Sequence, residues 1–209
     1  MIHVVLCDDH ALVRRGIRDT LEEAGDIEIT GEAGSYSELR EVLRSAVCDV
    51  LLLDLNMPGR SGLEVLGALR ETHPHIRAVV VSMNPADQYA VRCLRAGAHG
   101  YASKAADPVV LIDAVRVVAQ GRKYLTADVA QMLAESISEP AREAAHSALS
   151  ERELQTLLKI ASGRRLSEIA EELMLSPKTV SVYRARVLEK LKLSNNAELT
   201  AYAIRNDLV

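Results

Sequence analysis

The chain has 209 residues and a formal net charge of −4, with 48% hydrophobic and 26% charged residues, a balance typical of one or two globular domains. The sequence has no uncharged apolar tract of about 18 residues and no basic, signal-like start, so we expect a cytoplasmic protein without membrane contact. The scattered Cys7, Cys48 and Cys93 argue against a disulfide framework or zinc cluster, and the absence of Phe and Trp argues against stacking on single-stranded bases.

The first 120 residues alternate between strand-like and helix-like patterns of apolar residues. Apolar runs predict five strands, at 2–7, 27–33, 49–54, 76–82 and 99–103. Helix starts between them carry capping signals, namely the Ser35 to Glu38 spacing and Asp107 before Pro108. This regular alternation predicts an α/β domain with a doubly wound, five-stranded parallel sheet.

Polar residues stand at the carboxyl ends of the predicted strands, where the ligand sites of parallel sheets collect. Asp8 and Asp9 follow the first strand, Asp54 ends the third, Ser82 ends the fourth, and Lys104 follows the fifth. Clustered carboxylates repel one another unless a cation lies among them, and Mg²⁺ suits an all-oxygen site. Each residue alone has an ordinary structural explanation as a cap, a turn or a solvated charge, but their order favours one phosphoryl-transfer site.

The rest of the chain reads as a linker at 121–148, with one helix from about 126 to 137, followed by four short helices within 149–209. Ser150 and Glu153 form a capping box, and Ser176 with Pro177 starts the third helix. Residues 146–209 carry a net charge of +2, whereas the remainder of the chain carries −6. Two short helices around a tight turn, the second of them basic, indicate a helix-turn-helix that binds the DNA major groove.

The segments CDDH, LLDLNMPGRSGLEVL, VVVSM and AGAHGYASK resemble those of bacterial two-component response regulators with a CheY-like receiver domain over 1–120. The C-terminal half resembles the LuxR-type helix-turn-helix domain, and the whole chain resembles the NarL/FixJ family. This resemblance implies a transcription factor, not an enzyme, that accepts a phosphoryl group from a sensor histidine kinase. It also implies a homodimer on phosphorylation or on double-stranded promoter DNA.

The resemblance implies roles for the acidic residues of the receiver half. Asp54 matches the phosphoacceptor. Asp9 and the main-chain carbonyl of Asn56 match direct Mg²⁺ ligands beside Asp54, while Asp8 matches a ligand that acts largely through water.

The resemblance also assigns the residues at the last two strand ends. Ser82 and Tyr101 match the family's switch pair, and Lys104 matches its phosphate-contacting lysine. Ala105 stands where many receivers have proline, which leaves open whether the bond after Lys104 is cis, since a non-proline cis peptide costs about 2.5 to 4 kcal/mol.

The helix that starts at Pro177 is the predicted recognition helix. Its apolar stripe should face the domain core and consists of Val180, Val187, Leu188 and Leu191. Residues suited to phosphate contacts are Lys178, Thr179, Tyr183, Arg184, Arg186 and Lys190. By resemblance, the base-reading positions are Ser181, Val182 and Ala185, whose small side chains predict modest base discrimination.

Two other classes of protein compete with this interpretation. An aspartate-nucleophile phosphatase of the haloacid dehalogenase type needs a second acid two residues after the nucleophile, where this chain has Asn56. A ligand-sensing LuxR-type regulator would need an enclosed, usually aromatic-lined pocket in its first half. The acidic strand ends favour the response regulator over both.

Overall fold

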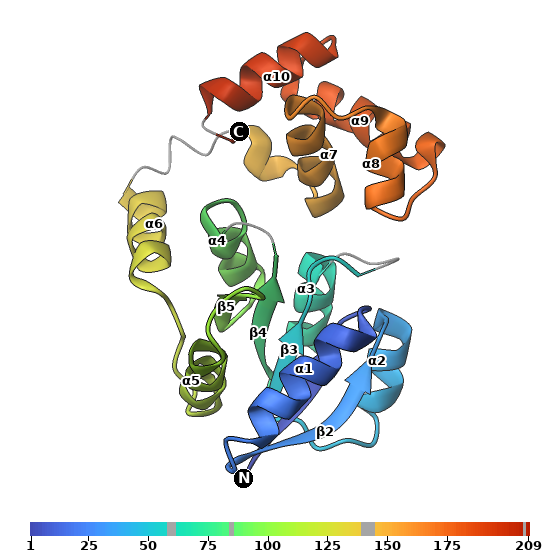
Figure 1. Ribbon diagram of the computed structural model, residues 1–209. Coiled ribbons are helices and arrows are strands. Elements are labelled where there is room, and N and C mark those ends of the chain that lie inside the picture. Colours follow the sequence, from blue (N-terminus) through green and yellow to red (C-terminus); the bar gives the residue numbers. More distant parts are fainter. Residues whose placement is uncertain (58–61, 84–85, 139–144, 207) are drawn as a thin grey trace. The chain divides into compact units, whose positions relative to one another are not determined.

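The computed structural model describes residues 1–57, 62–83, 86–138, 145–206 and 208–209. The chain divides into two compact units, residues 1–135 and residues 136–209. The first unit contains a parallel sheet with helices on both faces, and the described residues of the second form helices (Figure 1). The expected boundary at residue 120 falls inside the first unit.

Five parallel strands form the sheet, in the order β2-β1-β3-β4-β5. Their bounds are β1 Ile2–Cys7, β2 Ile27–Ala33, β3 Val50–Leu53, β4 Arg77–Ser82 and β5 Gly100–Ser103. The helices of this unit are α1 Ala11–Glu22, α2 Tyr36–Val42, α3 Gly62–Thr72, α4 Ala86–Ala96, α5 Pro108–Ala119 and α6 Ala127–Ser138, whose last residues pass into the second unit. The predicted doubly wound, five-stranded parallel sheet is confirmed.

Helix starts follow the capping signals of the sequence, with one difference. Asp107 accepts a hydrogen bond from the Val109 N–H at 2.9 Å, and proline occupies the next position of α5. Ser35 accepts from the Glu38 N–H, but the Glu38 carboxylate accepts from the Gly34 N–H at 2.7 Å instead of from Ser35. Ser35 is therefore the N-cap as predicted, but the reciprocal bond of a standard capping box falls on Gly34, one residue earlier.

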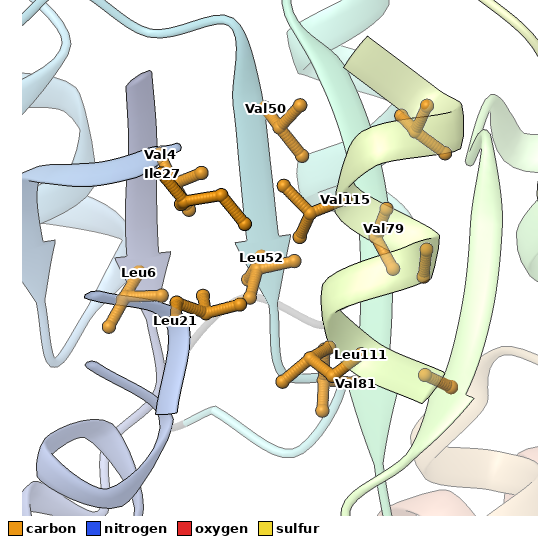
Figure 2. Close-up of a cluster of buried hydrophobic side chains, with 13 residues drawn as sticks. Val4, Leu6, Leu21, Ile27, Val50, Leu52, Val79, Val81, Leu111 and Val115 are labelled. Carbon is orange, nitrogen blue, oxygen red and sulfur yellow. The ribbon is translucent and has the colours of Figure 1, made fainter. Parts of the chain in front are cut away.

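A buried apolar cluster packs one face of the sheet against α1 and α5 (Figure 2). Val81 of β4 and Ala102 of β5 belong to it. Because side chains alternate along a strand, the neighbouring Ser82 and Tyr101 point to the opposite face, and both are buried. Ser82 is the last residue of β4, and Tyr101 is the second residue of β5, against which helix α4 packs.

The chain after α5 returns to the outer strand of the sheet. The Tyr124 N–H donates to the His99 oxygen at 2.9 Å, and Tyr124 forms a parallel bridge with Gly100. A Cβ atom at residue 100 would lie 3.2 Å from the Cβ atom of Tyr124. The first part of the expected linker is thus packed against the sheet.

The second unit is built from short helices. They are the 3₁₀ helix η2 Ala145–Ala148 and the α-helices α7 Glu151–Ala161, α8 Leu166–Glu172, α9 Pro177–Leu191 and α10 Asn196–Arg205. The predicted capping box at Ser150 and Glu153 is present, and Ser176 caps α9. This order agrees with the predicted helix-turn-helix, with α8 and α9 around the turn.

The predicted apolar stripe of α9 faces the interior of the second unit. Val180, Val187 and Leu191 are buried, whereas Leu188 is only half-buried.

No helix among the described residues combines the length and apolarity that crossing a membrane requires.

Candidate functional site

The strand register brings the predicted acidic residues together at one edge of the sheet. Cys7 of β1 lies opposite Leu53 of β3, so Asp8 and Asp54 follow the two strands at neighbouring positions. The Asp54 N–H donates to the Cys7 oxygen at 2.8 Å. On the far side, the Lys104 N–H donates to the Ser82 oxygen at 3.0 Å, which brings the lysine to the same edge.

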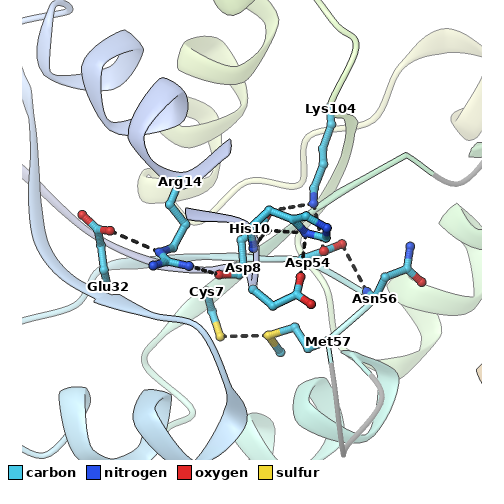
Figure 3. A network of polar contacts seen from close by, with 10 residues as sticks. Cys7, Asp8, His10, Arg14, Glu32, Asp54, Asn56, Met57 and Lys104 are labelled. Atoms are coloured by element: carbon cyan, nitrogen blue, oxygen red, sulfur yellow. Dashed lines mark hydrogen bonds and ion pairs between the residues drawn. The ribbon is translucent and has the colours of Figure 1, made fainter. Parts of the chain in front are cut away.

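Lys104 bridges two of the carboxylates (Figure 3). Its Nζ atom lies 2.6 Å from Oδ2 of Asp8 and 2.8 Å from Oδ2 of Asp54, and only 9% of its side chain is exposed. The Asn56 N–H donates to Oδ1 of Asp54 at 3.2 Å. The peptide bond after Lys104 is trans. Lys104 thus neutralises part of the acidic cluster from inside the fold.

His10 joins this cluster, a residue to which the sequence interpretation gave no role. The Nδ1 atom of its ring lies 2.7 Å from Oδ1 of Asp9, and its main-chain N–H donates to Oδ1 of Asp8 at 2.8 Å. Its position directly after the two aspartates was the available signal. Ligand atoms of Asp8, Asp9, His10 and Asp54 all lie within 4.8 Å of one another.

These residues fit a divalent cation. Oδ1 of Asp9 is buried, with Nδ1 of His10 beside it at 2.7 Å. A buried carboxylate oxygen needs a cation or a donor, and either His10 or a bound metal ion can fill that role. Three carboxylates with hard oxygen atoms suit Mg²⁺.

Burial and charge shift the pKa values at this site. Burial, together with the neighbouring Asp8 carboxylate, raises the pKa of Asp54 despite the hydrogen bond from Lys104. Burial lowers the pKa of Lys104, but the hydrogen bonds and charges of Asp54 and Asp8 outweigh it and raise the pKa overall. The ammonium is therefore held in its charged form between the two acids.

A second candidate site is the outer face of α9. Lys178, Ser181, Ala185 and Arg186 are exposed, and Val182 is 44% exposed. This face therefore presents both cationic and small apolar side chains, the two kinds that phosphate and base-edge contacts need.

The remaining predicted DNA contacts are more enclosed. Thr179, Tyr183 and Arg184 are half-buried, and Nε of Arg184 donates to Oδ1 of Asn196 at 2.5 Å. The Arg184 guanidinium is therefore already engaged by α10, although its remaining donors leave it able to contact another group.

Lys190 reaches inward. Its Nζ atom lies 2.7 Å from Oε2 of the buried Glu153 and 3.2 Å from the Ala148 oxygen. This interaction ties the end of α9 to the start of α7 and to η2. The Lys190 side chain stays 40% exposed, so the ion pair engages its ammonium without removing it from the surface.

Comparison with known families accounts for both sites. Residues 4–116 match the response regulator receiver domain, and residues 147–203 match the bacterial regulatory proteins of the luxR family. The chain is a NarL/FixJ-family response regulator. Its receiver domain carries the acidic cluster, and its LuxR-type DNA-binding domain carries α9.

Relatives match this response regulator over nearly its whole length. The response regulator UvrY of Escherichia coli K12 is 40% identical over 209 residues, which is 100% of this chain and 96% of UvrY. RcsB of Salmonella enterica serovar Typhimurium, bound to promoter P1flhDC in the presence of the phosphomimetic BeF3−, superimposes with a TM-score of 0.61 at 29% identity, covering 96% of this chain and 97% of RcsB. A structure of two RcsB dimers bound to two parallel DNAs gives a TM-score of 0.60 at 28% identity, covering 96% of each chain.

Proposed function

We propose that this response regulator is a transcription factor controlled by phosphorylation of Asp54, with a sensor histidine kinase as the phosphoryl donor. The observation that carries the proposal is the position of Asp54, buried at the carboxyl end of β3 with Lys104 at 2.8 Å. A cytoplasmic location follows from the proposed partners, the kinase and promoter DNA.

The proposed transfer uses residues of the acidic cluster. A carboxylate oxygen of Asp54 forms a bond to phosphorus in line with the phosphorus–nitrogen bond of a kinase phosphohistidine, which breaks and leaves its electron pair on the ring nitrogen. Lys104 moves from its carboxylate partners to a phosphoryl oxygen. Asp8, Asp9, Asp54 and the Asn56 carbonyl would hold Mg²⁺, and the ion would supply positive charge for the phosphoryl oxygens.

The protein modifies only itself, so we do not class it as an enzyme. Self-phosphorylation from small donors and slow loss of the phosphoryl group are the limits of its chemistry. Hydrolysis of the phosphoryl group requires water to reach the acyl phosphate, and the burial of Asp54 restricts that access.

The signal leaves the site through Ser82 and Tyr101, which lie on the α4 face of the sheet. In this proposal the Ser82 hydroxyl turns toward the phosphoryl group, and Tyr101 repacks beside α4. This change biases an existing equilibrium toward a homodimer that binds DNA. The RcsB structures with promoter DNA and as dimers support this outcome.

DNA contact is assigned to the outer face of α9. Lys178, Arg186 and the free donors of Arg184 would contact phosphates, with help from the half-buried Thr179 and Tyr183. Ser181, Val182 and Ala185 would meet base edges. Lys190 would contribute a phosphate contact with an ammonium that Glu153 already engages.

The test is phosphoryl labelling of the full chain by acetyl phosphate with Mg²⁺, followed by intact mass. Asp54→Asn should abolish the added phosphoryl group, and Asp9→Ala should nearly abolish it. Asp49→Asn is a matched control, because Asp49 precedes β3 at the opposite end of the strand and pairs with His3. Persistent labelling of Asp54→Asn would assign the acceptor to another residue.

A further inference from the structure

Arg14 connects the acidic cluster to the edge strand β2 (Figure 3). From the start of α1, its Nη1 atom donates a hydrogen bond to the main-chain oxygen of Asp8 at 2.5 Å. Its Nε atom donates to Oε2 of Glu32, on β2, at 3.2 Å. The other carboxylate oxygen of Glu32 pairs with Arg18, one turn further along α1.

These contacts hold both main-chain polar groups of Asp8. Its N–H donates to the Ala33 oxygen at 3.0 Å, and its carbonyl accepts from Arg14. The Asp8 carbonyl and the Asp9 N–H belong to one planar peptide group. Fixing that oxygen therefore also fixes the direction in which Asp9 leaves the strand.

The Arg14–Glu32 pair is enclosed enough to act as a fixed support. The exposed fractions of the two side chains are 19% and 23%. A guanidinium that makes two directed bonds from this position restricts rotation of the Asp8–Asp9 peptide.

We propose that Arg14 is a positioning residue of the cation site and acts through the Asp8–Asp9 peptide. The inference rests on the proposed function, since it takes these carboxylates to bind Mg²⁺. Carboxylates that are ordered before the ion arrives lose less freedom on binding, so affinity rises. Arg14 donates to the Asp8 main-chain carbonyl, so it supports the site through the backbone.

Charge alone predicts the opposite effect. A guanidinium near a cation site repels the cation, so removing Arg14 would strengthen Mg²⁺ binding if charge were its only contribution. Loss of positioning would weaken Mg²⁺ binding. The direction of the change therefore distinguishes the two roles.

The test compares Arg14→Ala and Arg14→Lys with Arg18→Ala in the full chain. Arg18 shares Glu32 but belongs to the next turn of α1, so it is the matched control. Mn²⁺ binding, followed by electron paramagnetic resonance, and the Mg²⁺ dependence of acetyl phosphate labelling are measured for each variant. Arg14→Ala should weaken cation binding about tenfold, as loss of an outer support of metal ligands does.

The pattern across the variants decides the proposal. Arg14→Lys keeps the charge but not the two directed bonds, so its half-saturating Mg²⁺ concentration should also rise. The labelling rate at saturating Mg²⁺ should stay near that of the wild type for both Arg14 variants, and Arg18→Ala should match the wild type throughout.

Three results would overturn the proposal: tighter cation binding in Arg14→Ala, an equal loss in Arg18→Ala, or a lower maximal rate with an unchanged half-saturating concentration. Circular dichroism checks folding, and if Arg14→Ala does not fold, Arg14→Lys and Glu32→Gln carry the comparison. Failure of the wild type itself to bind Mn²⁺ or to accept a phosphoryl group would instead reject the proposed function.

Discussion

The Nζ atom of Lys104 lies 2.8 Å from Oδ2 of Asp54, and both side chains are almost fully buried. The lysine comes from the loop after β5 and the aspartate from the end of β3, so the ion pair joins segments 50 residues apart. A buried charge of either sign is costly without its partner. Loss of either partner should therefore destabilise the receiver domain, and the pair lies at the site that we propose for the phosphoryl group.

Lys104→Ala should destabilise the cation-free protein by about 3 kcal/mol, because two buried carboxylates lose their ammonium partner. Mg²⁺ should restore part of this loss and should stabilise the variant more than the wild type, since the ion no longer competes with the lysine. Urea unfolding with and without Mg²⁺ measures both effects. Lys123→Ala is the control, because that ammonium donates to the Ala98 carbonyl instead of a carboxylate; an equal response in both variants would contradict the explanation.

Ser82→Ala should separate phosphorylation from its effect. The variant should still accept a phosphoryl group on Asp54, but its DNA affinity should not rise on phosphorylation, since the buried hydroxyl that would turn toward the phosphoryl group is missing. Labelling by acetyl phosphate and DNA binding before and after labelling are measured on the same preparation. Ser103→Ala, at the paired position of β5 but exposed, is the control. Normal activation of Ser82→Ala would exclude this relay.

Arg186→Ala and Val182→Ala should have different defects on DNA. Loss of the exposed Arg186 should weaken binding to target and random DNA alike and reduce the magnitude of the slope of log K against log salt by about 0.9. Truncation of Val182 should leave the slope unchanged and cost on the order of 1 kcal/mol on the target alone, if it contacts a thymine methyl group. Titrations of both DNAs across a salt series measure these effects. Equal losses for Val182→Ala on both DNAs would mean that this face does not read bases.

The Glu153–Lys190 pair should make the DNA-binding domain sensitive to acid. Burial raises the pKa of Glu153, but hydrogen bonds from Lys190 and the Ser150 N–H outweigh it and hold the pKa below the ordinary value of 4.5. The pair therefore contributes its full stabilisation above about pH 4.5 and loses it as the pH falls through the lower folded-state value. Glu153→Gln should lower the free energy of unfolding at neutral pH and flatten its decline below pH 4.5. Urea unfolding between pH 3 and 7 tests this, with the exposed Glu171→Gln as control; parallel curves for wild type and Glu153→Gln would argue against it.

The sequence predicts the strands, the sheet and most helix starts because these depend on residues close together in the chain. Short apolar runs locate β1 to β5, and short spacings such as Ser150 to Glu153 locate caps. The convergence of Asp8 and Asp54 follows as well, since parallel strands present their carboxyl ends at one edge.

Side-chain partners across the fold could not be predicted in this way. Arg14 and Glu32 look like ordinary surface charges in the sequence. Their contact with each other, and the bond from Arg14 to the Asp8 carbonyl, depend on the angle at which α1 meets β2. Lys190 is a residue type suited to a phosphate contact, but α7 places the Glu153 carboxylate within its reach. Such pairs depend on distances between elements, which periodicity does not encode.

The bridge between Gly100 and Tyr124 has a consequence for how the receiver domain can be isolated. A strand at the border of a sheet offers free N–H and carbonyl groups on which a second molecule can assemble. Tyr124 already takes up part of that border at β5. A fragment that stops at residue 120 would lose this cover and expose β5 to edge-to-edge aggregation. A fragment that continues to residue 135 would keep Tyr124 paired with Gly100 at that edge.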